Sequence, residues 1–425
     1  MIAWLLISFF VLLFLGVPIA MSLGLSAMGG ILFLGGGSTV TIAQRMFEGM
    51  NSFALLAIPL YTFAGFTMSK GGISKRLMDF CYSIVGHIYG GLAHVNVLSS
   101  MIFAGMSGSG VADTAGVSGM FMPEMIRKGY SKNFTVAVTA ISSTIGIIIP
   151  PSIPMVVIAG ICGISTGKLF LGGIIPGILC GLAQMIVSYF LAKKEGVPKE
   201  PGHFTIGPVL HGLWESWPAL LMPIIIVGTI TMGIVSPTEA GVIAVVYGLF
   251  AGGIIYRELK WEDIKFAFAE TVRTSGRIFI VIGAAKLYTV MLTTAGFDKW
   301  VAKTMLGFST NPTVILIMIL LIFFIVTMFM ESIATLTLFM PILYPIALGV
   351  GINPIVLSVL ITVVIGIGLV TPPVGMCIYV ACDLMDTTVG EVFPTLVPFI
   401  AATFVCIALM VAFPQLILLP TYLMA

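Results

Sequence analysis

The sequence predicts an all-α polytopic membrane protein built from two halves of inverted topology, and its composition, length and internal repeat each support this. Of the 425 residues, 59% are hydrophobic and 8% are charged, whereas a soluble domain carries about a quarter charged residues because its surface faces water. Since a spanning helix needs roughly 20 apolar residues, the length allows about ten to twelve spans. Most of the surface is therefore expected to face lipid.

Apolar runs separated by polar, glycine or proline residues predict ten crossings. The first run lacks the basic segment and the small-residue cleavage site of a signal peptide, so we expect it to be a membrane helix. Residues 2–35 are expected to form two spans, with one tilted helix as the alternative. The ten predicted crossings lie at residues 2–16, 18–35, 52–69, 133–162, 170–192, 216–235, 238–256, 275–295, 354–382 and 392–418.

Two further apolar stretches carry an acid and polar residues at their centres, where a simple span would be apolar. They cover residues 92–128 and 311–349, and we expect each to be a re-entrant hairpin. The charged residues within 70–79 and 257–277 are typical of amphipathic arms that lie in the membrane interface.

The distribution of lysine and arginine over alternate loops predicts the orientation, because cytoplasmic loops carry an excess of these residues. One set of loops holds twelve, namely Lys70, Lys75, Arg76, Arg127, Lys128, Lys132, Lys193, Lys194, Lys199, Arg257, Lys260 and Lys265. The other set holds chiefly four, namely Arg45, Lys168, Lys299 and Lys303. Both termini are therefore expected outside the cytoplasm, and a single helix over residues 2–35 would move only the N-terminus.

A weak internal repeat supports the two halves. The FMP motif of residues 121–123 recurs at 339–341, and the same spacing places Asp113 on Glu331. Double prolines supply further anchors, each followed at one and the same distance by another proline: Pro150-Pro151 with Pro176, and Pro372-Pro373 with Pro398. Each half then holds five crossings and one hairpin, and an odd number of crossings inverts the second half. Such inverted repeats mark secondary transporters, with the site near the midplane.

The most informative segment is GMSGSGVADTAG, residues 105–116, at the turn of the first hairpin. Its glycines and serines permit a tight reversal and leave carbonyls and hydroxyls free. Inside a membrane such backbone survives only where it lines a cavity or is buried in protein. The segment predicts an oxygen cage for a small hard cation, and the alternative is a kinked helix packed through small residues. In the second hairpin, MFMESIATLT offers the oxygens of Glu331, Ser332 and Thr335.

Each hairpin is expected to face a helix broken by a double proline, SSTIGIIIPPSIP at 142–154 and GIGLVTPPVG at 366–375. Proline lacks a backbone donor and disfavours helix in the residue before it, so several carbonyls lose their helical partners. Such carbonyls can coordinate sodium, while the N-terminus of the resuming half-helix favours an anionic group. The carbonyls concerned belong to Gly146, Ile149, Gly368, Val370 and Thr371.

Three charged residues within the predicted membrane need an explanation, because an unpaired charge there is costly. For Asp113 and Glu331 three roles are open: capping of a helix at the hairpin tip, coordination of an ion or of substrate water, and a proton relay. Lys286, midway along the span 275–295, either attracts a substrate carboxylate or snorkels or pairs with another chain.

Several function classes are excluded by what the sequence lacks. No P-loop, HExxH or GxSxG motif occurs, and the four histidines lack metal-like spacing. No acid pair, serine–base pair or metal triad supports an intramembrane enzyme. The six cysteines lie singly in apolar stretches and are expected to be core residues. A net charge of +2 without a dense basic run argues against a nucleic-acid partner. An ion gradient is the natural energy source, since each inward charge gains about 2.3 kcal/mol per 100 mV.

At the motifs GMSGSGVADTAGV, FMPEMIRKGY, IIPPSIPM and TPPVGM, the chain resembles the large membrane subunit of tripartite ATP-independent periplasmic (TRAP) transporters, the DctM and SiaM type. The resemblance runs from about Leu55 to the C-terminus. It implies an elevator-type fold similar to the ion transporter superfamily and a sodium-coupled importer of organic acids, with sialic acid favoured and C4-dicarboxylate next. It also implies the bacterial inner membrane, periplasmic termini, a small four-helix membrane subunit and a periplasmic substrate-binding protein.

The resemblance further implies binding of two or more sodium ions. The first site would join Ser107, Gly108, Ser109 and Gly110 to Gly146 and Pro150, and the second would join Glu331 and Ser332 to Gly366, Thr371, Pro372 and Met376. Substrate would touch Ser107, Ser109, Ser152 and Glu331, with Asp113 in a structural or coupling role. Since no arginine lies in either tip, carboxylate recognition would rest on hydroxyls, amides, helix ends and bound sodium.

The implied division of the chain is residues 1–90 and 196–308 as scaffold, the latter with a linker and an amphipathic arm, and 91–195 and 309–425 as the two parts of a transport domain. The nearest alternative is a stand-alone sodium/dicarboxylate or anion symporter, and an ion channel is a further one. Uptake without any binding protein would indicate the symporter, and flux through a continuously open path would indicate the channel.

Overall fold

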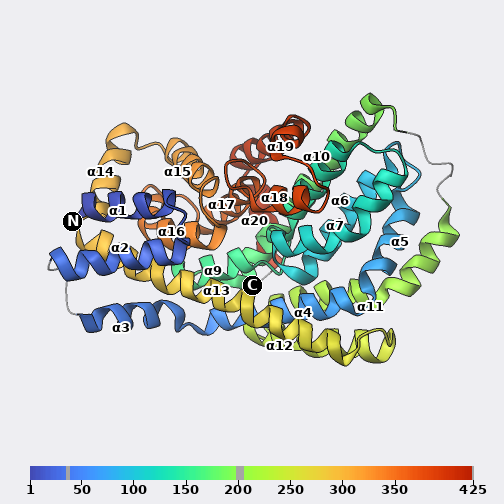
Figure 1. Ribbon diagram of the computed structural model, residues 1–425, viewed down its shortest axis with the longest axis horizontal. Coiled ribbons are helices and arrows are strands. Elements are labelled where there is room, and N and C mark those ends of the chain that lie inside the picture. The colour runs from blue at the N-terminus through green and yellow to red at the C-terminus, as the bar shows by residue number, and fades with distance from the viewer. Residues whose placement is uncertain (35–38, 198–204, 424–425) are drawn as a thin grey trace.

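The computed structural model describes residues 1–34, 39–197 and 205–423, and every regular element in these ranges is a helix (Figure 1). Residue 35, the expected end of the second span, and Lys199 lie outside the described ranges. Within them, seven helical stretches are long and apolar enough to cross a membrane, at residues 53–70, 166–195, 206–231, 237–255, 261–294, 332–349 and 389–412. The prediction of an all-α polytopic membrane protein is confirmed.

The chain begins with two short apolar helices, α1 (Ile2–Phe14) and α2 (Ile19–Leu34). A turn at Gly16, with φ of 80°, and Pro18 reverses the chain between them. The helices are then antiparallel, because Ser26 Oγ donates to the Leu5 carbonyl at 2.9 Å and Trp4 Nε1 donates to the Ser26 carbonyl at 3.3 Å. The alternative of one tilted helix is therefore wrong.

A helix that the hydropathy pattern did not indicate follows, α3 (Thr39–Met50), and it packs along α13 (Trp261–Thr294). Arg45 and Glu48 interrupt its apolar run, so a search for uniformly apolar segments passes over it. In α13 the expected amphipathic arm and the expected span form one continuous helix of 34 residues, about 50 Å long at 1.5 Å per residue. No proline interrupts this sequence, and nothing lies within 4 Å of a Cβ added at Gly276.

The remaining outer helices pair the two halves of the chain. Helix α4 (Ala57–Lys70), which follows the short turn η1 (Phe53–Leu56), packs against α12 and α13, and α5 packs against α11. In Figure 1, α3, α4, α12 and α13 lie along one long side of the molecule. The other elements are α5 (Ile73–Val85), α11 (Ile206–Thr231), α12 (Pro237–Phe250), η3 (Ala251–Ile255) and α14 (Phe297–Phe308).

Two helical hairpins and two interrupted helices form the inner part of the molecule, one of each per half. In the first half these are α6 (Gly91–Ser107), α7 (Gly110–Arg127), α8 (Lys132–Ser143), η2 (Thr144–Ile147), α9 (Ile153–Cys162) and α10 (Thr166–Glu195). In the second half they are α15 (Pro312–Thr327), α16 (Ser332–Gly349), α17 (Pro354–Gly368), α18 (Met376–Asp383), α19 (Val389–Ala412), α20 (Gln415–Leu418) and η4 (Leu419–Leu423). Both double prolines fall in the interruptions.

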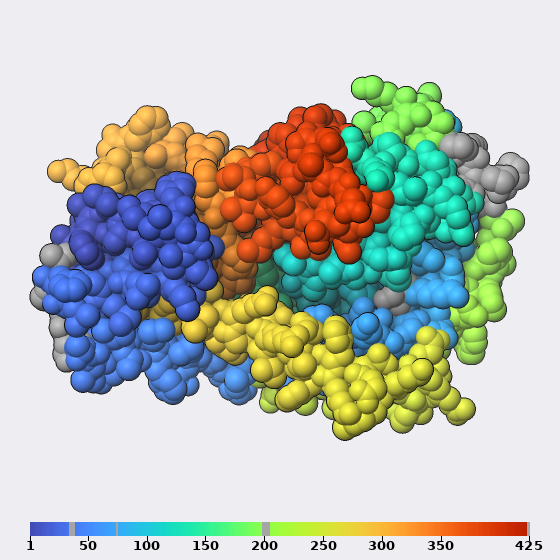
Figure 2. Space-filling view, in the orientation of Figure 1, coloured from blue at the N-terminus to red at the C-terminus, as the bar shows by residue number. Residues whose placement is uncertain are grey.

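These two inner sets of helices interlock. Helix α9 of the first half packs on α16 of the second, and α18 of the second half packs on α7 and α8 of the first. Figure 2 shows the corresponding surface, with the second-half residues in orange to red directly against the first-half residues in cyan to green. Each half therefore supplies a half-helix that rests on the other half's hairpin.

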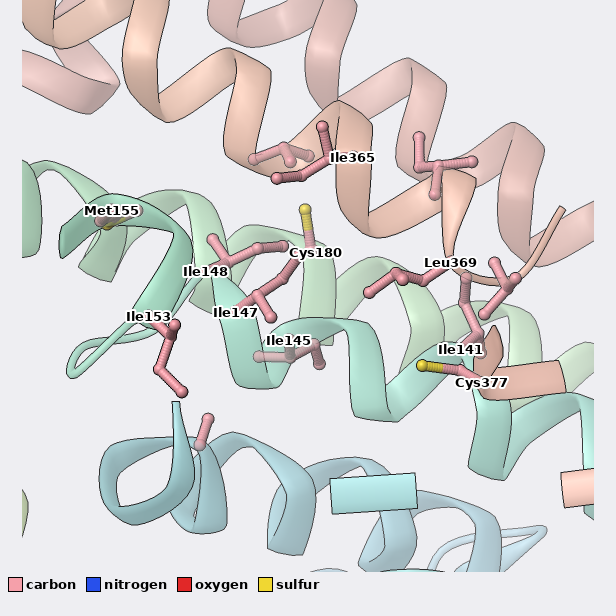
Figure 3. Packing of buried hydrophobic residues seen from close by; sticks show 14 of the residues in the cluster. Ile141, Ile145, Ile147, Ile148, Ile153, Met155, Cys180, Ile365, Leu369 and Cys377 are labelled. Carbon is pink, nitrogen blue, oxygen red and sulfur yellow. The ribbon is translucent and has the colours of Figure 1, made fainter. Parts of the chain in front are cut away.

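Apolar side chains around the two interruptions form the centre of the core. Figure 3 shows Ile145 and Ile147 of η2, together with Ile148, close to Ile365 of α17 and to Leu369, the residue that follows α17. These five residues are at most 5% exposed. The broken segments of the two halves are thus held against one another by close apolar packing.

The structure corrects the register of the internal repeat. Ser109 is the N-cap of α7 and Glu331 is the N-cap of α16, so these two residues occupy equivalent positions. The register that pairs them, here called the cap register, also pairs the caps Ser131 and Asn353, the helix prolines Pro123 and Pro345, and the two double prolines. The pairing of Asp113 with Glu331 is therefore wrong, and in the cap register Asp113 corresponds to Thr335.

Candidate functional site

The tip of the first hairpin is a two-residue turn between α6 and α7. Gly108 has φ of 66°, in the left-handed region that favours glycine, and Ser109 returns to an extended backbone. The Ser109 hydroxyl caps α7 by accepting from the Ala112 amide at 3.5 Å, and Gly110 is the first helical residue. The reversal that the glycine and serine pattern predicted is present, and it brings the backbone of the tip against the first interruption.

Asp113 lies in the first turn of α7 and is fully buried. Its Oδ1 accepts a hydrogen bond from Ser107 Oγ, and the Ser107 hydroxyl also accepts from the Ser109 amide at 3.3 Å. Its Oδ2 has no hydrogen-bond partner among the described residues. A buried carboxylate oxygen without a donor is costly, and a bound cation would reduce this cost. Since no described residue bonds this oxygen, it can contact a cation.

Gly146 of η2 faces that free oxygen. A Cβ added at Gly146 would lie 2.0 Å from Asp113 Oδ2 and 3.5 Å from the Ser109 carbonyl oxygen. Only a residue without a side chain fits this contact. The structure therefore brings Ser107, Ser109 and Gly146 of the predicted first site together with Asp113.

The Gly108 carbonyl joins the tip to the first interruption, because it accepts from the Ile153 amide at 3.1 Å. The Pro151 carbonyl oxygen lies 2.8 Å from a Cβ added at Gly108, so the Pro150-Pro151 segment, whose peptide bond is cis, lies directly beside the tip. Ser152 is the N-cap of α9, and its hydroxyl donates to the Ile147 carbonyl at 2.5 Å. The predicted substrate contact Ser152 is thus fully buried and bonded within its own segment.

In the second hairpin, Glu331 is the N-cap of α16. Its Oε2 accepts from the Ile333 amide at 2.9 Å and from the Ala334 amide at 3.2 Å. Ser332 follows as the first helical residue, and its buried hydroxyl has no hydrogen-bond partner within the described ranges. Carboxylate caps at a helix N-terminus are favoured by the dipole, so this acid has a structural role before any ligand is considered.

The second hairpin meets the second interruption through Thr327 and Met328, which were not among the predicted ligands of the second site. The Met328 carbonyl accepts from the Val374 amide at 2.9 Å, so a tip carbonyl is bonded to the interruption in this half too, although at residues that are not equivalent to Gly108 and Ile153. A Cβ added at Gly368 would lie 2.5 Å from Thr327 Cβ. Gly368 corresponds to Gly146 in the cap register, so in both halves a glycine of the interruption packs on the hairpin that it faces.

The other predicted residues of the second site are spread over two surfaces. Gly366 faces the first half, since a Cβ there would lie 3.5 Å from both Thr144 Cβ and Ile147 Cδ1. Thr371 Oγ1 donates to the Ile367 carbonyl at 2.7 Å. Pro372 lies in the interruption, and Met376 begins α18. The nearest neighbours of Gly366 thus belong to the first half, and the side-chain bond of Thr371 stays within its own segment.

The donor set at these tips consists of hydroxyls, carbonyls and single carboxylates. Among the residues that the structure describes, no group of three or more His, Cys, Asp or Glu side chains could hold a metal ion together. Oxygen donors suit hard cations, whereas transition metals prefer nitrogen and sulfur. The partnerless Asp113 oxygen and the adjoining carbonyls at the first tip therefore fit a small hard cation such as sodium.

Lys286 contacts the first-half helix α3. It is half-buried on α13, where its side chain packs against Gly49 of α3. The hydrogen bond from Arg45 and then the positive charge of Lys286 hold the pKa of Glu48 below its usual value. Lys286 therefore has an acidic neighbour on this chain.

Two solved structures share the fold. The crystal structure of the Alcanivorax borkumensis YdaH transporter aligns with a TM-score of 0.60 at 14% identity, over 87% of this chain and 86% of that one. The Neisseria gonorrhoeae MtrF efflux pump aligns with a TM-score of 0.61 at 15% identity, over 88% and 84%. The class that the fold defines is thus a polytopic helical membrane protein with the fold of these two structures.

The chain belongs to the DctM family: residues 6–416 match the model of the "Tripartite ATP-independent periplasmic transporter, DctM component". Vibrio cholerae sialic acid TRAP transporter large permease protein SiaM is 35% identical over 96% of this chain and 95% of its own length. Pseudomonas aeruginosa C4-dicarboxylate large permease protein DctM is 35% identical, over 95% and 94%. The Oleidesulfovibrio alaskensis isethionate permease protein DctMQ is 37% identical over 92% of this chain, which spans 62% of that protein's length.

Family membership decides several expectations. The protein is a transporter permease subunit and not an enzyme, and it is one component of a three-part transporter. It is a multi-pass protein of a family located, in bacteria, in the inner membrane.

Proposed function

We propose that this protein is the membrane-embedded transport subunit of a sodium-coupled, binding-protein-dependent importer of organic acids. The observation that carries the proposal is that each half has a backbone bond between a hairpin tip and an interruption, from the Ile153 amide to the Gly108 carbonyl and from the Val374 amide to the Met328 carbonyl. Each of these bonds lies at a place where a helix is interrupted, and carbonyls at such interruptions coordinate coupling ions in inverted-repeat transporters.

The first sodium ion is proposed to lie at the first tip. Asp113 Oδ2 is buried without a donor among the described residues, and both this oxygen and the Ser109 carbonyl oxygen face Gly146. Two oxygens that attract a cation are therefore in place. Ser107, Gly108, Gly110, Gly146 and Pro150 remain the proposed lining of this site. The charge of a sodium ion would offset the cost of the buried carboxylate.

The second sodium ion is proposed to lie at the second tip. Its proposed lining is Glu331, Ser332, Gly366, Thr371, Pro372 and Met376. The Ser332 hydroxyl, which has no partner among the described residues, supports it. Because Thr327 and Met328 contact the interruption, we place the centre of the second sodium site nearer to these two residues than to Glu331. Sodium would supply charge compensation for both the acid and an incoming substrate anion.

The substrate is proposed to be an organic acid, with sialic acid tested first and a C4-dicarboxylate next. The named substrates of relatives at similar identity are sialic acid, C4-dicarboxylate and isethionate. All three are organic anions of different shape. A site built from hydroxyls, helix N-termini and bound sodium can accept a negative group without an arginine, and Ser107, Ser109, Ser152 and Glu331 stay the proposed contacts.

The proposed motion is of the elevator type, with the hairpins entering the membrane from opposite faces. Residues 91–195 and 309–425 would move as one body, which the packing of α9 on α16 and of α18 on α7 supports. Residues 1–90 and 196–308 would form the fixed scaffold around α4, α12 and α13. Partners are proposed to be a small four-helix membrane subunit and a periplasmic substrate-binding protein, with both termini in the periplasm.

Reconstitution tests this function. The chain is co-purified with a small four-helix membrane subunit of a TRAP transporter from the same organism, placed in proteoliposomes, and supplied with a periplasmic binding protein of that system and radiolabelled sialic acid or C4-dicarboxylate. We expect uptake that requires an inward sodium gradient and the binding protein. Uptake that persists with potassium in place of sodium would overturn sodium coupling, and uptake without binding protein would indicate the stand-alone symporter.

A further inference from the structure

A buried polar cluster fastens the first hairpin to the first interrupted helix, well away from the hairpin tip. Asn96 of α6 donates from Nδ2 to Thr139 Oγ1 of α8 at 2.8 Å, and its Oδ1 accepts from Ser142 Oγ at 2.9 Å. One turn further along α6, Ser100 Oγ donates to Ser142 Oγ at 3.0 Å. All four residues are 0% exposed.

The hydrogen bonds within this cluster have fixed directions. Thr139 Oγ1 donates its proton to the Thr135 carbonyl at 2.8 Å, so toward Asn96 it can only accept. Ser142 Oγ uses its proton on Asn96 Oδ1 at 2.9 Å or on the Thr139 carbonyl at 3.1 Å, so toward Ser100 it can only accept. An amide that uses both its donor and its acceptor on one neighbouring helix sets the relative height of the two helices, because a shift by one residue breaks both bonds.

The cluster adjoins the candidate cation site through the backbone of α8. Ser142 is followed by Ser143, whose carbonyl oxygen lies 3.1 Å from a Cβ added at Gly110 of the tip. Four residues after Ser142 comes Gly146, which faces Asp113 Oδ2. The end of α8 is thus held on one side by Asn96 and Ser100 and on the other by the tip itself, so the height of α6 against α8 determines the gap between Asp113 and Gly146.

The second half has the same packing without the polar cluster. Helices α15 and α17 pack as α6 and α8 do, but every residue of α15 from 314 to 326 is apolar. In the cap register, Ile361 and Val364 stand where the first half has Thr139 and Ser142. The fold therefore does not need these polar groups to pack a hairpin on an interrupted helix.

We infer that Asn96, acting through Thr139 and Ser142, is a positioning residue for the first cation site. It does not contact the ion. It fixes the height of the first hairpin against α8, so that the Asp113 carboxylate and the carbonyls near Gly146 are held at one spacing, as a small hard cation requires. This inference rests on the proposed sodium coupling and adds a residue that sets its affinity.

The test compares two substitutions at one position. Thr139→Val keeps the shape of the side chain and removes the acceptor of the Asn96 amide, whereas Thr139→Ser keeps the hydroxyl and removes a methyl group. Ile361→Val removes a methyl group at the matching apolar position of the second half. The readouts are the sodium concentration for half-maximal uptake in the reconstituted three-part system, and the sodium-induced rise in the Tm of the purified permease.

We expect Thr139→Val to raise the half-maximal sodium concentration by about tenfold and to reduce the sodium-induced rise in Tm. Thr139→Ser and Ile361→Val should stay within about twofold of the parent protein, since directional bonds survive in both. A lower Tm or a lower maximal rate in Thr139→Val with an unchanged sodium constant would show a merely structural role and overturn the inference.

The experiment also distinguishes a failure of sodium coupling from a folding defect in Thr139→Val. If the parent protein takes up substrate independently of sodium, the proposed coupling fails before the positioning role is reached, and the positioning role fails with it. If Thr139→Val does not give a single peak in gel filtration, the pair Ser142→Ala and Ser142→Thr decides. Ser142→Ala should then raise the sodium constant about threefold and Ser142→Thr should not, and equal constants in the two would overturn the inference.

Discussion

Asp113 and Gly146 meet so closely that a Cβ added at Gly146 would lie 2.0 Å from Asp113 Oδ2. The contact joins a hairpin to an interrupted helix and leaves the carboxylate oxygen without a hydrogen-bond donor among the described residues. A buried acid in this state has to be offset by a positive charge or by protonation. The contact between these two residues is therefore the most direct place to test cation binding.

Gly146→Ala should sharply weaken sodium dependence. No Cβ tolerates a heavy atom at 2.0 Å, so the Asp113 side chain or η2 must move and the oxygen spacing changes. We expect at least about a tenfold rise in the sodium concentration for half-maximal uptake, equivalent to about 1.4 kcal/mol. Gly119→Ala is the control, because nothing lies within 4 Å of its added Cβ. Equal sodium constants for the two variants would contradict the assignment.

The second half offers a paired experiment on two glycines of one helix. Gly368→Ala should impair transport because its Cβ would lie 2.5 Å from Thr327 Cβ. Gly366→Ala should be tolerated, since its nearest neighbours are at an ordinary 3.5 Å and its carbonyl is retained. Uptake rates and Tm values of the two variants in the same membranes measure the difference. A more severe defect in Gly366→Ala would show that the packing on Thr327 does not govern this site.

The sequence predicted the elements of the site better than it predicted their contacts. Runs of apolar residues, glycine-rich turns and double prolines are local signals, and they located the hairpins and the interruptions correctly. Which carbonyl of a tip meets which amide depends on the length of the turn. The first tip has two residues between its helices and the second has four, at positions 328–331. The contact of the second tip therefore falls on Met328 rather than on Glu331.

The register of the repeat failed for a related reason. The FMP motif is short and sits inside a helix, where nothing ties it to a fixed position. Caps and helix-breaking prolines are tied to a position by geometry, since a helix must begin at its cap. The caps Ser109 and Glu331 pair with each other, and the same register pairs the double prolines. The acids Asp113 and Glu331 are thus in different structural positions.

Asp113→Asn tests whether the carboxylate charge is needed at the first tip. Asparagine keeps the size of the side chain and can still accept from Ser107, so the fold should survive while the negative charge is lost. We expect sodium affinity to fall by about tenfold or more, with a Tm in the absence of sodium at or above that of the parent protein. Isothermal titration with sodium chloride against choline chloride provides the measurement. Undiminished sodium binding would rule out Asp113 as a ligand.

Outside the site, Arg76 of α5 binds the turn before α13 through a group of contacts, here called the Arg76 clasp. This clasp should contribute only modestly to stability. Its guanidinium lies 2.7 Å from Glu258 Oε1, donates to the Gly72 carbonyl at 2.7 Å, and stacks 4.2 Å from the Tyr256 ring centroid. Glu258→Gln removes only the ion pair, which is partly exposed, and should lower the stability by less than about 1 kcal/mol.

Arg76→Ala should cost more than Glu258→Gln, because it also removes the cation–π contact, worth about 0.5–1 kcal/mol, and the bond to Gly72. Arg76→Lys should fall between them, since lysine keeps the charge and loses the planar fork. The measurement is Tm at low and high salt, with Arg45→Ala of an exposed pair as the control. The sodium constant of uptake should stay unchanged throughout. An unchanged Tm in Glu258→Gln at low salt would show that the ion pair contributes nothing, and equal losses in Glu258→Gln and Arg76→Ala would show that the stacked ring and the Gly72 bond add nothing to it.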